Sequence, residues 1–89
     1  MGNRTLGQTP HLKFYELAQP SGKRTRVWEV LAGVHSLGTI RWHAPWRRYC
    51  FFPNELTLYD ALCLREIADF VGEKTLTRKA ERRLERIGL

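Results

Sequence analysis

The spacing of apolar residues changes once along this chain, near Pro53-Asn54. Before that point, short runs rich in Val, Ile, Trp, Tyr and Phe are separated by Gly and Pro clusters, a pattern typical of antiparallel strands. After it, apolar residues recur every three to four positions, as they do on one face of a helix. A chain of 89 residues has room for one small domain with one core. These features predict an α+β fold in which the strands precede the helical region.

Four strands are predicted, over residues 12–18, 27–32, 37–43 and 46–52. The turn cluster QPSG at residues 19–22 separates the first two, and Pro45 separates the last two. A tight hairpin at Ala44-Pro45 would place Arg41 opposite Arg48, Trp42 opposite Arg47 and Ile40 opposite Tyr49.

The region after Asn54 predicts two helices. Thr57 is a candidate N-cap with Asp60 three residues later, and residues 58–71 show helical spacing. Gly72 stands where a helix C-cap would, so the first helix should end there. A threonine at position 75 or 77 then begins a short basic helix with a thin apolar stripe of Leu76, Ala80, Leu84 and Ile87.

The predicted architecture is ββββα(α): a three- to four-stranded antiparallel sheet, one long helix on one face, and a short basic C-terminal helix. Residues 1–11 are expected to form a flexible N-terminal arm, residues 12–74 a single α+β domain, and residues 75–89 the basic helix. No internal repeat or second domain is expected.

Alternation along strands sorts the predicted sheet into two faces. The core face would carry Trp28, Val30, Ile40, Trp42, Tyr49 and Phe51. The helix residues expected to cover it are Ala61, Leu64, Ile67 and Val71. The opposite face would carry Glu29, Thr39, Arg41, Arg48 and Cys50, with Leu31, Leu37 and Phe52 towards its ends. Nothing is expected to cover this second face, and arginines beside apolar residues on an open face resemble a binding surface.

The net charge of +6 is unevenly distributed. Residues 54–74 are acidic, whereas the segments before and after them are basic. Arginine outnumbers lysine, 11 to 4, which favours bidentate recognition of anions. The chain therefore predicts a two-signed surface with local arginine clusters.

Several classes of function are disfavoured. The three histidines and two cysteines show no zinc-ligand spacing, no phosphate loop or nucleophile motif is present, and no apolar run is long enough to cross a bilayer. We expect a cytoplasmic, non-enzymatic protein without cofactor or metal and without a membrane partner. Cys50 and Cys63 are expected to stay thiols and to act as small buried hydrophobes.

The segment from Val27 to Phe70 carries the patterns W-E-V, L-G-x-I-x-W, W-R-x-Y-x-F-x-P and T-x-x-D-x-x-C-L-x-x-I-A-x-F. They begin at Trp28, Leu37, Trp46 and Thr57. In them the chain resembles a group of short uncharacterised proteins of bacteriophages, plasmids and other mobile DNA. The resemblance implies a mobile-element setting but no established activity. The order of strands and helix is also similar to that of small DNA-binding domains of the AP2 and phage-integrase arm-binding type, a likeness of topology alone.

Two functions fit these observations. The first is a nucleic acid-binding module that uses the arginine-bearing sheet face, extended by basic residues at both ends. The residues expected to bind are Arg41, Arg47, Arg48, Arg24, Arg26, Trp46, Arg78, Arg82 and Arg83. The alternative is a protein-binding inhibitor or adaptor, such as an anti-defence protein of anti-CRISPR type, with a host or defence protein as partner. Homodimerisation through the uncovered face would use the same residues, and a charged helix can also be merely solvated.

Overall fold

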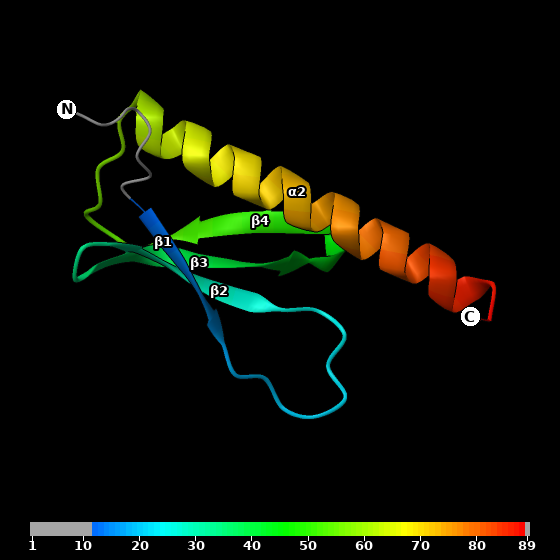
Figure 1. The fold of residues 1–89 in the computed structure, drawn as a ribbon. Coiled ribbons are helices and arrows are strands. Elements are labelled where there is room, and N and C mark those ends of the chain that lie inside the picture. Colours follow the sequence, from blue (N-terminus) through cyan, green and yellow to red (C-terminus); the bar gives the residue numbers. More distant parts are fainter. Residues whose placement is uncertain (1–11, 89) are drawn as a thin grey trace.

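The computed structural model describes residues 12–88 (Figure 1). The N-terminal arm expected over residues 1–11 lies outside them. In chain order the elements are β1 (Leu12–Leu17), β2 (Val27–Ala32), β3 (His35–His43), a 3-10 turn η1 (Ala44–Trp46), β4 (Arg48–Pro53) and the helix α2 (Ala61–Arg86). The predicted α+β class, with a four-stranded antiparallel sheet and one long helix, is confirmed.

Consecutive strands pair with one another, so the sheet order is β1-β2-β3-β4 and all pairs are antiparallel. The helix α2 lies across one face of this sheet, closest to β4, and its C-terminal part extends past the strands (Figure 1). The other face has no described element over it. The fold therefore has two layers, with the core between the sheet and the helix.

The helix does not end at Gly72, and the separate basic C-terminal helix is not present: both segments belong to one helix of 26 residues. Gly72 is not among the residues with positive φ, as a glycine C-cap would be. Beyond it, Thr75 Oγ1 accepts a hydrogen bond of 3.0 Å from the Tyr49 amide of β4, and Arg78 is buried. These contacts hold the second half of the helix to the sheet and offset the cost of about 1 kcal/mol for a glycine inside a helix.

The N-cap is Asp60 rather than Thr57. The Asp60 carboxylate accepts a hydrogen bond of 2.9 Å from the Cys63 amide. Thr57 instead donates its hydroxyl to the Asn54 carbonyl oxygen at 2.9 Å and lies 2.7 Å from the Tyr59 hydroxyl. Thr57 thus shapes the loop before the helix, which starts three residues later than the sequence pattern indicated.

The β3–β4 hairpin has a different register from the one predicted. Arg41 pairs with Cys50, Trp42 with Tyr49, and His43 with Arg48. The turn takes four residues because η1 is followed by Arg47 in the left-handed conformation, at φ 55° and ψ 47°. The prediction that Arg41 faces Arg48 is therefore wrong. The shift is two residues, so the paired residues from Ile40 to Phe51 keep their predicted faces.

The core forms where the predicted sheet face meets a helix face centred on Ile67. The buried apolar residues are Leu12, Trp28, Val30, Leu37, Ile40, Tyr49 and Ile67. Around them, Phe14 stacks on Phe70 with ring centroids 4.1 Å apart. The expected cover by Ala61 and Leu64 is wrong: both are exposed, Leu64 by 53%. The covering residues beside Ile67 are Cys63, Phe70 and Val71.

Leu37 is also misplaced by simple alternation. It was expected on the open face but is buried in the core. The β2–β3 ladder shifts between Val30 and Leu31, so that Val30 pairs with Gly38 but Leu31 pairs with Ser36. Leu37 is the extra, unpaired residue of this bulge, and the local bend of β3 directs the Leu37 side chain into the core.

Candidate nucleic-acid interface

A pocket of about 250 Å³ lies between the C-terminal half of α2 and the β3–β4 hairpin. Its lining consists of one aromatic residue and five cationic residues. These are Trp42, Arg47, Lys79, Arg82, Arg83 and Arg86, and they are called the basic pocket from here on. No carboxylate is among them. A concave site with this lining attracts anions strongly.

Helical geometry explains why four of the cations share one side of α2. Lys79, Arg82, Arg83 and Arg86 follow the spacing i, i+3, i+4 and i+7, which places them on neighbouring positions of one face. Seven residues of helix rise about 10 Å, so the four charges form a short row. A single strand of nucleic acid presents phosphates over a comparable distance.

The hairpin supplies the other wall of the basic pocket. Trp42 is the penultimate residue of β3, and its indole packs edge to face with the Tyr49 ring at 5.2 Å between centroids. Arg47 follows η1, and its amide donates to the His43 carbonyl at 2.9 Å and to the Ala44 carbonyl at 3.1 Å. These backbone bonds fix the turn from which the Arg47 side chain extends.

The charge of the basic pocket is not neutralised within residues 12–88. There, none of its five cationic groups has a carboxylate oxygen within 4 Å. The ion pairs in this part of the chain use other arginines: Arg24, Arg26 and Arg78. Guanidinium groups held close together without counter-charges repel one another, and a bound anion would relieve this repulsion.

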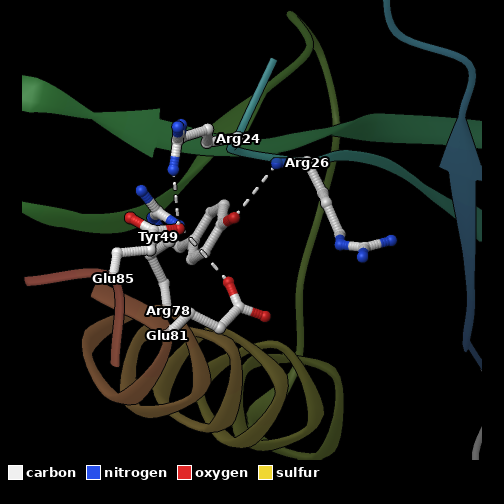
Figure 2. Close-up of polar contacts among 6 residues, drawn as sticks. All are labelled: Arg24, Arg26, Tyr49, Arg78, Glu81 and Glu85. Carbon is white, nitrogen blue, oxygen red and sulfur yellow. Dashed lines mark hydrogen bonds and ion pairs between the residues drawn. The ribbon is translucent and has the colours of Figure 1, made fainter. Parts of the chain in front are cut away.

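Figure 2 shows the cluster that holds the C-terminal half of α2 against the sheet. Arg78 is only 8% exposed, and its Nη1 lies 3.4 Å from a Glu81 oxygen and 3.3 Å from a Glu85 oxygen. Glu85 also pairs with Arg24 of the β1–β2 loop at 3.0 Å. These ion pairs therefore tie the β1–β2 loop to the helix, beside Tyr49 of the sheet (Figure 2).

The charges in this cluster change the pKa of Glu85. Desolvation alone would raise it, but the hydrogen bond and charge of Arg24, together with Arg78, lower the pKa of Glu85 below its ordinary value of 4.5. In the same region the Arg26 amide donates to the Tyr49 hydroxyl at 3.1 Å, and its guanidinium pairs with Glu16 at 2.8 Å. The hydrogen bond and the charge of Glu16 raise the pKa of Arg26.

The nine residues predicted to bind fall into three groups. Arg47, Arg82 and Arg83 come together in the basic pocket. Arg24, Arg26 and Arg78 form ion pairs with carboxylates instead. The remaining three, Arg41, Arg48 and Trp46, lie on the open sheet face or at the hairpin tip.

The open-face residues make their own local contacts. The Arg41 guanidinium lies 4.0 Å above the centroid of the Phe52 ring. Arg48 Nε donates to the Trp46 carbonyl oxygen at 3.2 Å. The Trp46 indole is 63% exposed and meets the His43 ring edge to face at 5.0 Å. These residues do not form a cluster of charges comparable to the basic pocket.

Three members of the basic pocket are not among the nine residues predicted to bind: Trp42, Lys79 and Arg86. Lys79 and Arg86 belong to the basic C-terminal segment that the sequence points to, and they share the helical spacing of Arg82 and Arg83. Trp42 was assigned wholly to the core, yet it is only half-buried. Its place beside the arginines depends on an unbroken helix, which the sequence did not predict.

The open sheet face is the second surface of interest. Val27, Leu31 and Phe52 are half-buried there, and Tyr15, which shares their side of the sheet, is 63% exposed. Cys50 also lies on this face, whereas Cys63 packs against the core, and both are free thiols.

Burial raises the pKa of the Cys63 thiol, and the Asp60 carboxylate raises it further.

Within residues 12–88, no group of three or more His, Cys, Asp or Glu side chains is arranged to hold a metal ion. In the same part of the chain, no helix combines the length and the apolar character needed to span a membrane.

The fold and the basic pocket together define a small α+β protein with a four-stranded meander, one long helix and a cationic site at their junction. The chain is 34% identical over 73 residues to an uncharacterised 9.3 kDa protein of Acholeplasma phage L2, in an alignment that covers 80% of this chain and 92% of the phage protein. It therefore belongs to the same family as that phage protein. No family model and no solved structure matches the chain.

Proposed function

We propose that this protein is a nucleic acid-binding module of a mobile genetic element and that it binds through the basic pocket. The observation that supports this most is the gathering of five cations without a carboxylate around Trp42. The relationship to a phage protein and the mobile-element patterns in the sequence support the setting. The open sheet face, which the sequence favoured as the binding surface, has fewer cations and includes Glu29.

Phosphate neutralisation is the physical basis of this proposal. Lys and Arg side chains that contact phosphates release condensed counterions, so affinity falls as the salt concentration rises. With four or five contacts, binding to a duplex is expected to weaken roughly 100- to 500-fold between about 50 and 200 mM salt. This dependence distinguishes phosphate contacts from apolar binding.

The test is fluorescence anisotropy with labelled single- and double-stranded DNA at these two salt concentrations. The wild-type chain is compared with Arg82→Glu in the basic pocket and with Arg41→Glu on the open face, which change the net charge equally. We expect Arg82→Glu to abolish most binding and Arg41→Glu to retain most of it. Absence of wild-type binding at low salt refutes the proposal, and equal losses in both variants refute the assignment to the basic pocket.

The second candidate function is a protein-binding inhibitor or adaptor that uses the open sheet face. Its support is the exposure of Tyr15 on the same sheet face as Val27 and Leu31, together with Arg41 and Arg48 on that face and the exposed Trp46 at the hairpin tip. An interface core of aromatic and aliphatic residues with a cationic rim fits an acidic protein surface. Affinity capture from the host should then recover one protein in equimolar amount, which Tyr15→Glu loses and Arg82→Glu retains. Recovery of nucleic acid alone contradicts this candidate.

A further inference from the structure

We propose that the basic pocket is specific for single-stranded nucleic acid: one unpaired base packs against Trp42 while the phosphates follow the row of cations on α2. This inference rests on the proposed function and makes it more specific. It concerns which form of nucleic acid is bound, because phosphate contacts alone are available on single strands and duplexes alike.

The first observation is that the aromatic residue and the cations line the same concave site. In a duplex, each base is covered on both faces by its neighbours, so a tryptophan at the surface reaches only backbone and groove edges. An unpaired base has a free face, and its stacking on an aromatic side chain is the usual source of affinity in single-strand binding. Trp42 is half-buried, which leaves part of its indole for such contact.

The second observation is the size of the site. The pocket has a volume of about 250 Å³ and is open to solvent rather than enclosed. A hollow of this size has room for one base of a flexible strand, whereas the bases of a duplex are stacked inside the double helix and cannot turn into it. The row from Lys79 to Arg86 rises about 10 Å, so it can contact only a few consecutive phosphates of a bound strand.

The third observation is the arrangement of cations around Trp42. Arg47 comes from the hairpin, while Lys79, Arg82 and Arg83 come from α2, so charges flank the indole on two sides. A base bound at Trp42 therefore has cationic groups near the phosphates that precede and follow it. Arginine can in addition stack on the base itself, because its guanidinium is planar.

The experiment compares three ligands of equal length, about 15 nucleotides, at about 50 mM salt with the full chain. They are a deoxythymidine strand, a strand of the same length made of abasic sugars, and a duplex of mixed sequence. The abasic strand keeps every phosphate and lacks every base. We expect the deoxythymidine strand to bind at least tenfold more tightly than either of the others.

Variants at position 42 identify the stacking residue. Trp42→Leu should weaken binding of the deoxythymidine strand roughly 5- to 100-fold and leave binding of the abasic strand unchanged. Trp42→Tyr should restore much of the loss, because a phenol ring also stacks. Trp46→Leu, which removes the more exposed indole at the hairpin tip, is the matched control and should bind like the wild type. Circular dichroism of each variant confirms that it is folded.

The outcomes separate this inference from the proposed function. Equal affinity for the deoxythymidine and abasic strands, or tighter binding of the duplex, overturns the single-strand inference and leaves the proposed function standing. Failure to bind any of the three ligands at low salt overturns both. Loss of binding in Trp46→Leu but not in Trp42→Leu places the stacking site at the hairpin tip and overturns the assignment to Trp42.

Discussion

Replacing Gly72 by alanine should stabilise the protein. Gly72 lies inside α2 without a positive φ, is exposed, and an added Cβ there would meet no atom within 4 Å. A glycine inside a helix costs about 0.5–1 kcal/mol relative to alanine, because its unfolded chain is more flexible. With no strain or clash to oppose this gain, Gly72→Ala should raise the free energy of unfolding by about 0.5–1 kcal/mol.

For a domain of this size, a change of 1 kcal/mol shifts Tm by about 4–8 °C. The predicted increase for Gly72→Ala is therefore about 2–8 °C, measured by following the helical circular dichroism signal on heating and in urea. Gly33→Ala is the matched control. Gly33 lies in the β2–β3 turn at φ +61° with equally open surroundings, so alanine there should cost about 1–2 kcal/mol.

The two variants together test whether the helix is continuous. If α2 ended at Gly72 in a left-handed cap, alanine would be strained there as it is at Gly33, and both variants would lose stability. A lower Tm for Gly72→Ala than for the wild type refutes the continuous helix. It would also undermine the basic pocket, because Lys79 to Arg86 reach Trp42 only as part of this helix.

Three further outcomes are expected. Arg78→Met keeps an apolar stem but leaves Glu81 and Glu85 without their buried partner. Because both carboxylates are partly exposed, we expect the free energy of unfolding in urea to fall by about 1–2 kcal/mol, against less than about 0.5 kcal/mol for the exposed control Arg83→Met. Equal stability of the two variants would contradict the role of Arg78 in holding the helix. Since the pKa of Glu85 is lowered in the fold, the stabilising contribution of this carboxylate is complete above pH 4.5 and is lost as the pH falls below that value. The difference in unfolding free energy between the wild type and Glu85→Gln should therefore shrink on acidification. A constant difference would argue against the Arg24 and Arg78 contacts. Gly38→Ala should prevent folding or cost about 3 kcal/mol or more, because Gly38 has φ +147° and an added Cβ would lie 2.8 Å from the Pro53 Cα atom and against the Phe52 carbonyl oxygen. A normal melting curve for this variant would refute the close approach of β4 to Gly38.

The sequence predicted the sheet well because strand signals are local. β-branched and aromatic runs between Gly and Pro clusters located all four strands within about two residues, in line with the uncertainty of element ends. Apart from Leu37, the predicted faces of the strand residues also followed from alternation, even where the hairpin register was two residues off. Leu37 departed from alternation because a bulge is a property of two paired strands, which the pattern of one strand does not contain.

The helix was predicted less well because its continuity depends on tertiary contacts. Gly72 followed by Thr75 has the local pattern of a helix C-terminus followed by the N-cap of a new helix. The hydrogen bond from the Tyr49 amide to Thr75 and the burial of Arg78 outweigh that local preference. For the same reason, the sequence predicted Arg47, Arg82 and Arg83 as binding residues but did not predict that they lie together beside Trp42.

Charge is distributed unevenly along α2, so the electrostatic potential differs between the two ends of the basic pocket. The N-terminal half of the helix carries Asp69 and Glu73, whereas the C-terminal half carries the row of cations. Cations in the last turn, such as Arg83 and Arg86, also stabilise the negative end of the helix dipole, so part of this pattern has a structural reason. That reason does not extend to Lys79 or to Arg47 on the hairpin, which lie outside the last turn. A polyanion at Trp42 is attracted towards the C-terminal end of α2 and repelled from its N-terminal half, so a bound strand should continue past the C-terminal end, where the helix extends beyond the sheet (Figure 1).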